Sequence, residues 1–258
     1  MAAPRTALRV TLTCAVLAIG AAAMTPAVAL AGSMSFHSAV ASRHVGERSD
    51  PPVISRWQTD EGGVFVLDLS SPKPLLRFED SNEIWVLQPS PGPRGDVIYR
   101  NDLGEEMLRA TRLGGMTVFT VSRPEGSAAA LDGASAPLRI GALAPQAAWR
   151  RIYQATIRAS RAASHQVAFD PDPQAESANA SLYADAAMVV SEALTDMSDR
   201  PANRGLLARI DDVQIVPGPR PNVTLSRAGV LTITVVPAQG APAGRPSSRR
   251  IEKAIGAK

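Results

Sequence analysis

Short apolar runs alternate with turn residues between residues 62 and 122, and this pattern constrains the fold more than any other feature of the chain. Apolar runs of this length, bounded by Gly, Pro, Asn and Ser, are typical of antiparallel strands. The segment therefore predicts a meander of about six short strands. The runs cover residues 64–69, 75–78, 84–88, 97–100, 107–113 and 116–121.

Two of the turns have a recognisable chemistry. Gly114 and Gly115 predict a two-residue hairpin loop, because glycine reaches positive φ without a steric penalty. Residues 101–104 (NDLG) predict a type I turn that closes on a left-handed glycine. Both turns join strands that follow each other in the sequence, as a meander requires.

Helical spacing replaces the strand pattern after residues 123–144, a Pro/Gly/Ala/Ser stretch that predicts a loop. Two amphipathic helices are predicted, over residues 145–163 and 178–197. Their apolar stripes should pack together, which predicts burial of Trp149, Leu182 and Val189. The first helix is basic and the second acidic, so the pair predicts either a mutually neutralising surface or a charged groove.

Strand-like runs return over residues 208–237 and predict a C-terminal hairpin. Strands, then helices, then strands indicate an α+β fold. We therefore expect a single α+β domain over residues 62–237, in which an antiparallel β meander (62–122) and the C-terminal hairpin (208–237) form one antiparallel sheet system that packs with the two helices.

The N-terminal 31 residues predict export. Arg5 and Arg9 precede an apolar run, and residues 29–31 (ALA) form a cleavage pattern, so residues 1–31 are interpreted as a Sec-type signal peptide. Cleavage would remove Cys14, the only cysteine, and leave a periplasmic chain that uses no disulfide. No later apolar run reaches membrane-spanning length. Residues 32–60 predict an irregular N-terminal arm.

Residues 238–258 predict a flexible, basic, Pro/Gly-rich tail. Its cations Arg245, Arg249, Arg250 and Lys253 are candidates for a surface interaction. Such a segment would attract an envelope protein, a glycan or an anionic membrane surface.

Composition excludes several function classes. Only three histidines occur, and none stands in a Cys/His/Asp group with ligand spacing, so neither a metal nor a cofactor is expected. The formal net charge is +3, but the excess of basic residues lies in the leader and the tail. Because the body carries no basic face and few aromatic residues, nucleic-acid binding is not expected.

Two clusters of carboxylic acids are the best enzymatic candidates; a hydrolase triad through His165 has no local signature such as Gly-x-Ser-x-Gly. Glu79, Asp80 and Glu83 lie between two predicted strands, and Asp102, Glu105 and Glu106 lie at a later hairpin. A glycosidase needs two carboxyl groups about 5–10 Å apart, and neighbouring hairpins are able to supply them. Glu83 and Glu105 are the candidate catalytic pair. Acids at strand ends are more often solvated turn residues, so no enzymatic role is expected.

Three strings resemble an uncharacterised family of exported alphaproteobacterial proteins that is defined as a domain of unknown function. They are residues 92–96 (GPRGD), 109–117 (RATRLGGMT) and 245–251 (RPSSRRI). The resemblance implies compartment and lineage but no activity. The sequence as a whole predicts a non-enzymatic binding or envelope-accessory module, with an envelope glycan hydrolase or an apolar-ligand carrier as the alternatives.

Overall fold

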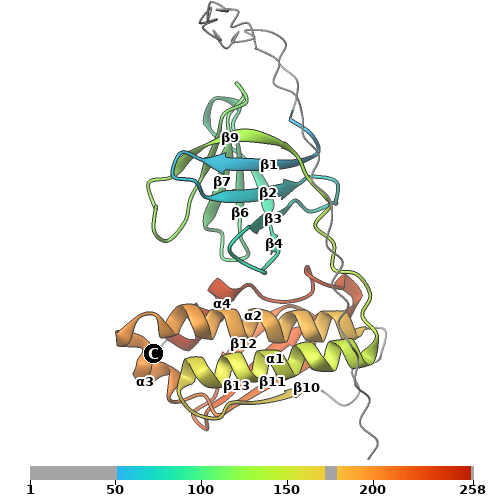
Figure 1. The fold of residues 1–258 in the computed structure, drawn as a ribbon, viewed down its shortest axis with the longest axis vertical. Coiled ribbons are helices and arrows are strands. Elements are labelled where there is room, and N and C mark those ends of the chain that lie inside the picture. The colour runs from blue at the N-terminus through green and yellow to red at the C-terminus, as the bar shows by residue number, and fades with distance from the viewer. Residues whose placement is uncertain (1–50, 172–178, 257–258) are drawn as a thin grey trace, which may run out of the picture. The chain divides into compact units, whose positions relative to one another are not determined.

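The computed structural model describes residues 51–171 and 179–256 (Figure 1). It contains a large antiparallel sheet, a second small sheet and four α-helices, which confirms the α+β class. The predicted signal peptide and most of the predicted arm lie outside the described residues. Among the helices described, none has the length and hydropathy needed to cross a membrane.

The large sheet has nine strands in the order β4-β3-β2-β1-β9-β8-β7-β6-β5, and each neighbouring pair is antiparallel. Most of its connections are tight turns between strands that are consecutive in the sequence, as a meander predicts. The strands are β1 (Ile54–Thr59), β2 (Val64–Asp68), β3 (Leu75–Phe78), β4 (Trp85–Val86), β5 (Gln88–Pro91), β6 (Val97–Arg100), β7 (Glu106–Ala110), β8 (Met116–Val118) and β9 (Ser127–Ala134). A 3-10 turn, η1 (Pro93–Gly95), separates β5 from β6.

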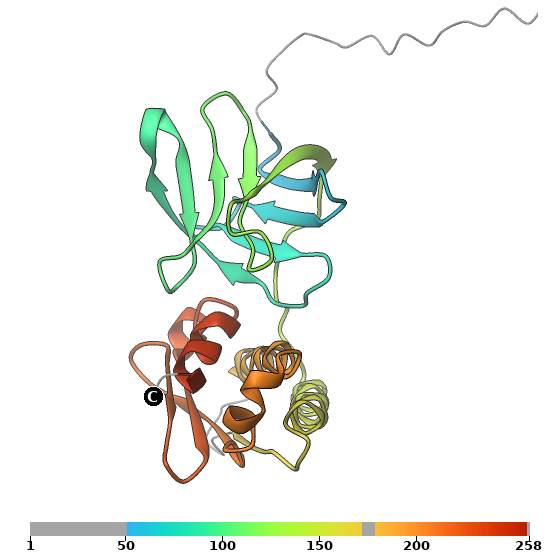
Figure 2. The ribbon, with the colours of Figure 1, turned by 90° about the vertical axis from the view of Figure 1, so that its left-hand side faces the viewer.

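The nine-stranded sheet curls on itself. Strands β4 and β5 form its two opposite edges, yet only Leu87 separates them in the chain. The edges therefore have to come together, and Figure 2 shows the resulting curvature. The enclosed face holds a core of its own, in which the ring planes of Trp57 and Phe65 are stacked with centroids 6.5 Å apart.

The two turns singled out in the sequence have different outcomes. The type I turn at residues 101–104 is confirmed: Gly104 has φ +81° and its N–H donates to the carbonyl of Asn101. The two-residue loop at Gly114 and Gly115 is wrong. Of the two glycines, only Gly114 has positive φ, at +86°. The Gly114 N–H donates to the Thr111 carbonyl and β7 already ends at Ala110, so the connection covers residues 111–115 and begins three residues earlier than predicted.

The C-terminal half consists of helices on a small mixed sheet with the strand order β10-β11-β13-β12. Strands β10 and β11 are parallel, as are β11 and β13, whereas β12 and β13 form an antiparallel hairpin. The elements are α1 (Pro145–Ala163), β10 (Ala168–Pro171), α2 (Ala180–Ser198), η3 (Pro201–Asn203), α3 (Arg204–Leu207), β11 (Asp212–Pro217), β12 (Asn222–Leu225), β13 (Val230–Val235), η4 (Pro237–Gln239) and α4 (Ser248–Gly256).

The pairing corrects the prediction of one antiparallel sheet. The C-terminal strands form a separate sheet with a separate apolar core, since α2 crosses from β10 to its parallel neighbour β11. A parallel pair needs such a crossover, and its pairing is not visible in local spacing. Two further segments also differ. The predicted arm already contains β1, and the predicted loop 123–144 contains β9.

Helices α1 and α2 pack through small residues. The buried positions of α1 are Ala148, Ile152, Ala155 and Ala159. Burial of Leu182 and Val189 in α2 is confirmed, with exposed fractions of 1% and 2%. Burial of Trp149 is wrong: the indole is 59% exposed. A contact made of alanines brings the helices close and leaves no room there for a large ring.

The expected flexible tail is also wrong for the residues described. Ile251 and Ile255 of α4 are 1% and 0% exposed and belong to the C-terminal core. Before α4, the Val236 N–H donates to the Gly244 carbonyl and closes a loop. Residues 236–256 are therefore part of the packed fold.

Candidate functional site

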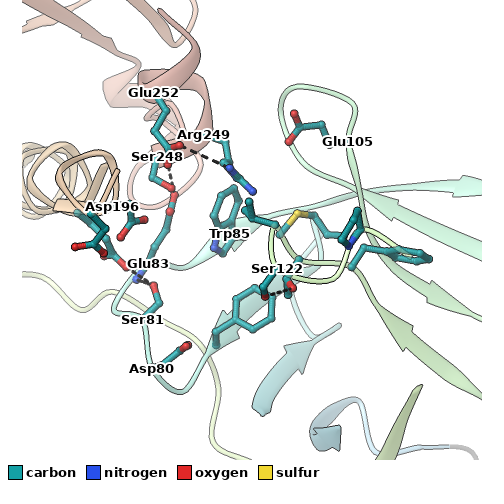
Figure 3. A pocket seen from close by; sticks show the side chains of 18 of the residues that line it. Asp80, Ser81, Glu83, Trp85, Glu105, Ser122, Asp196, Ser248, Arg249 and Glu252 are labelled. Atoms are coloured by element: carbon teal, nitrogen blue, oxygen red, sulfur yellow. Dashed lines mark hydrogen bonds and ion pairs between the residues drawn. The ribbon is translucent and has the colours of Figure 1, made fainter. Parts of the chain in front are cut away.

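A cavity of about 950 Å³ lies where the connections of the large sheet face α2 and α4 (Figure 3). The sheet contributes the β3–β4, β6–β7 and β8–β9 connections with nearby strand residues, and the other side comes from α2, the residues just after it, and α4. The wall consists of Phe78, Asp80, Ser81, Glu83, Trp85, Glu105, Glu106, Met107, Phe119, Thr120, Val121, Ser122, Pro124, Glu192, Asp196, Asp199, Arg200, Ser248, Arg249 and Glu252.

The wall is strongly acidic and partly aromatic. Eight of the side chains are carboxylic acids, and only Arg200 and Arg249 are basic. Three aromatic rings, Phe78, Trp85 and Phe119, lie among them. Of the two interpretations offered by the basic and acidic helices, the cavity favours the charged groove, because Glu192, Asp196 and Asp199 line it, although the charge of Arg158 on α1 also acts on Glu192.

Arg245 links α2 to the β3–β4 connection of the large sheet. Its Nε donates to Asp185 Oδ2 on α2 at 2.5 Å, and its Nη1 donates to Glu83 Oε1 in the β3–β4 connection at 3.2 Å. Its Nη2 donates to the Ile84 carbonyl at 3.0 Å. The Arg245 side chain is 2% exposed, so these bonds replace its hydration. Burial opposes its charge, but Asp185 and Glu83 outweigh burial and raise the pKa of Arg245.

A second contact ties the β6–β7 turn to the start of α4. Asp102 Oδ1 accepts from the Ser247 hydroxyl at 2.5 Å, and Asp102 Oδ2 accepts from Arg250 Nε at 2.8 Å. The Arg250 side chain is 33% exposed and that of Asp102 28%. This pair is therefore more hydrated than the Arg245 cluster and contributes less to stability.

Glu83 is the most buried acid of the wall. Its Oε1 accepts from Arg245 and from the backbone N–H of Ser248, the first residue of α4, at 3.1 Å. A carboxylate at a helix N-terminus is favourable. Burial nevertheless raises the pKa of Glu83 to about 7, against the lowering by Arg245 and Ser248. With its side chain 1% exposed, Glu83 acts first as a structural partner.

Three further acids have raised pKa values. Burial raises the pKa of Glu192, and Asp196 adds to the effect, although the Ser81 hydroxyl, which donates to Glu192, lowers it. Burial and then the charge of Asp199 raise the pKa of Asp196. Burial also raises the pKa of Glu252, which the ion pair with Arg249 at 3.6 Å counteracts. Burial therefore disfavours the simultaneous ionisation of the acids in this wall.

The structure separates the acids that the sequence grouped. Glu83 and Glu105 line the same cavity, as do Asp80 and Glu106. Glu105 is held by the Asn101 side-chain amide at 2.8 Å. Glu79 and Asp102 lie outside the wall and pair with Arg56 and Arg250.

The four predicted surface cations are also divided. Arg245 is buried, Arg250 is bound to Asp102, and Arg249 pairs with Glu252 in the cavity wall. Lys253 alone remains exposed on α4. A basic tail that is free to bind an anionic surface is therefore wrong for three of the four residues.

Sequence reasoning missed the helical side of the cavity. The acids at positions 192, 196 and 199 repeat at the spacing of one helix face, so the sequence showed an acidic stripe. It did not show that this stripe lies across a cavity from the β3–β4 connection. Arg200 and Glu252 had no signal of their own. Within residues 51–171 and 179–256, no group of three or more His, Cys, Asp or Glu side chains has the arrangement of a metal site.

Comparison with known proteins gives one match. The model of a family described as a domain of unknown function (DUF4908) matches residues 35–255. No curated protein and no solved structure matches the chain.

Proposed function

Since the chain belongs to the DUF4908 family, a domain of unknown function, we propose a function from its own residues: an exported, periplasmic, non-enzymatic binding module whose acidic cavity takes a polycationic ligand. The observation that carries the proposal is the wall of eight carboxylic acids and two arginines around about 950 Å³. The expectation of export comes from the leader pattern of residues 1–31.

The electrostatics of the wall favour a cation. Burial keeps the pKa values of Glu83, Glu192, Asp196 and Glu252 above their ordinary range. A bound positive charge lowers such pKa values, so ligand binding and carboxyl ionisation support each other. We therefore expect cation binding to be coupled to proton release from the acids whose pKa is raised.

The aromatic residues indicate which class of cation fits the cavity. Trp85, Phe78 and Phe119 line the same cavity as the acids, and the Phe119 ring already has the Arg109 guanidinium over it, 5.7 Å from its centroid. Ammonium or guanidinium groups on alkyl chains suit both features, because the charge meets carboxylates or a ring face while the methylene groups cover apolar surface. An apolar-ligand carrier is less compatible with this wall, because an uncharged ligand would dehydrate the acids without compensation.

Calorimetric titration with spermidine tests the proposal. We expect binding by the wild type and a loss of affinity of about ten-fold or more in the double variant Glu192→Gln with Asp196→Asn, which keeps the shape of the wall. Asp132→Asn is the matched control, because Asp132 is an exposed acid that pairs with Arg56 and does not line the cavity. Equal affinity in all three proteins, or no heat with the wild type, would contradict the proposal.

The pH dependence gives a second readout. Because the wall acids have raised pKa values, spermidine binding should strengthen from about pH 5 to about pH 7.5 and release protons to the buffer. Titrations in buffers of different ionisation enthalpy measure the number of protons released. A ligand that bound the surface alone would release none.

One observation favours the hydrolase alternative. Glu83 and Glu105 line one cavity, and burial raises the pKa of Glu83 to about 7, as a general acid requires. The ion pair of Glu83 with Arg245 and its 1% exposure count against access to a substrate. Release of soluble fragments from purified peptidoglycan, abolished by Glu105→Gln in a folded protein, would replace the binding module by the hydrolase.

A further inference from the structure

The outward face of α1 carries large aromatic side chains that the packing does not use. Trp149 is 59% exposed and Tyr153, one helical turn later, is 67% exposed. The other two tryptophans, Trp57 and Trp85, are 3% and 8% exposed. The buried side of α1 is complete without these rings, since alanines and Ile152 form it. Two exposed aromatic residues on one helix face therefore lack a structural role in the packed chain.

The same face is uniformly basic. Helix α1 contains four arginines and no aspartate or glutamate. At 100° per residue, Arg150, Ile157 and Arg161 lie within about 120° of Trp149 on the side of Tyr153. In the part of the chain that the structure describes, Arg150 and Arg161 take part in no ion pair or side-chain hydrogen bond. We call Trp149, Arg150, Tyr153, Ile157 and Arg161 the α1 outer face.

We propose that the α1 outer face docks on an anionic lipid membrane. Indole and phenol rings partition to the headgroup level of a bilayer, where an apolar ring and a polar edge are both accommodated. Arginine binds lipid phosphate through paired N–H donors. The negative potential of the lipid surface is complementary to a helix that carries positive charge alone.

The charge pattern favours a lipid surface over a protein partner. Protein interfaces use charges of both signs to set register, whereas α1 offers one sign over its 19 residues. The face is also a convex helix ridge, and a fluid headgroup layer accepts a ridge without a matching groove. This docking is independent of the cavity, because none of the α1 residues lines it.

The proposal relocates the lipid contact that the sequence assigned to the C-terminal tail. Arg245 is buried, and Arg250 is partly exposed but already engaged by Asp102, so neither is a free cation for phosphate. Arg150 and Arg161 are exposed and remain available.

The test is binding to vesicles by the protein recovered from the cells that produce it, with its N-terminus sequenced so that all variants are compared in the same form. One vesicle type is phosphatidylcholine alone, and the other contains about 30 mol% phosphatidylglycerol. Trp149 is the exposed tryptophan, so a blue shift of its emission reports docking directly. We expect binding to the anionic vesicles only, weakened by added salt.

Two variants and a control separate the outcomes. Arg150→Gln with Arg161→Gln should weaken binding about thirty-fold, from the loss of two charges near the surface. Trp149→Ala with Tyr153→Ala should also weaken it, by about ten-fold or more. The control, Arg77→Gln with Arg227→Gln, removes two exposed arginines elsewhere and should bind like the wild type.

Three results would overturn the proposal. They are equal binding to both vesicle types, variants that bind like the wild type, and self-association of the chain that the Trp149 variant abolishes in the absence of lipid. The last would assign the α1 outer face to a second copy of the chain instead.

Discussion

Helices α1 and α2 have the same length of 19 residues and pack against each other, yet twelve residues of α2 are buried and only four of α1. Helix α2 also contacts α3, α4, β11 and β13, whereas α1 has β10 and α3 as its other neighbours. A helix surrounded on several sides has to find partners for its polar side chains. In α2, Asp185 meets Arg245, and Glu192 accepts from Ser81. The arginines of α1 are exposed to water.

The largest loss of stability is expected from a charge placed at a buried position of α2. Val189→Asp puts an unpaired carboxylate at a position that is 2% exposed, which should cost about 4 kcal/mol or more and prevent folding under ordinary conditions. Tyr153→Asp on α1 makes the same charge at an exposed site and should cost about 0.5 kcal/mol or less. Urea unfolding measures both. Similar losses of unfolding free energy in the two variants would show that position 189 of α2 is no more buried in solution than position 153 of α1.

The next effect concerns the buried ion cluster of α2. Arg245→Met leaves Glu83 and Asp185 buried without their cation, at a cost of about 3–5 kcal/mol. Adding Glu83→Gln and Asp185→Asn removes the stranded charges and should recover most of this loss. Arg250→Gln, which breaks the half-exposed pair with Asp102, is the matched control and should cost about 1 kcal/mol. A single variant at Arg245 that melts like the wild type would mean that the cluster is hydrated in solution.

A smaller, pH-dependent effect is expected from the cavity side of α2. Burial raises the folded-state pKa of Glu192 and Asp196, and that of Glu83 to about 7. The stability linked to these groups is fully present below their unfolded pKa and is lost as pH rises through the folded value. The melting temperature should therefore fall from about pH 4.5 to about pH 7.5.

The variant Glu192→Gln with Asp196→Asn should flatten this dependence, while Asp132→Asn should leave it unchanged. Thermal melts followed by circular dichroism over the pH range measure the slope. A melting temperature that rises over the same window would show that the α2 acids are stabilised as ions.

The smallest effect belongs to the α1 outer face. Trp149→Ala with Tyr153→Ala should change the free energy of unfolding by less than about 1 kcal/mol, because both rings are more than half exposed. Chemical denaturation provides the measurement, with Ile152→Ala as the buried comparison on the same helix, at about 2–4 kcal/mol. A large loss in the aromatic variant would mean that the rings stabilise the fold and are not held for a partner.

Patterns of short range were readable before the structure. The strand runs of the meander, the turn that ends at Gly104 and the buried stripe of α2 each depend on residues within a few positions of one another. The sequence-based predictions were wrong where the same short pattern is compatible with two structures. The double glycine at 114–115 fits both a two-residue loop and the longer turn that occurs, and Trp149 fits either edge of an amphipathic helix.

The candidate site was predictable only in pieces. The acids at positions 83 and 105 and the acidic stripe of α2 were visible, since acids repeat at the spacing of one helix face. Their meeting in one cavity was not visible, because the β3–β4 connection and α2 are more than a hundred residues apart: Ser81 and Glu192 are separated by 111 positions.

The amino-acid sequence by itself determined most strands of the meander, the turn at Gly104 and helices α1 and α2, because periodicity and turn chemistry act over a few residues. Tertiary structure alone decided the separation into two sheets, the parallel pairing of β10 with β11 and the fate of each charge. Arg245 illustrates the reason. In the sequence it is one cation of a basic tail, and in the fold it is the buried partner of Asp185, 60 positions away, and of Glu83, 162 positions away. Whether a charge is solvated or buried depends on groups brought together by the whole chain, and no local pattern contains that information.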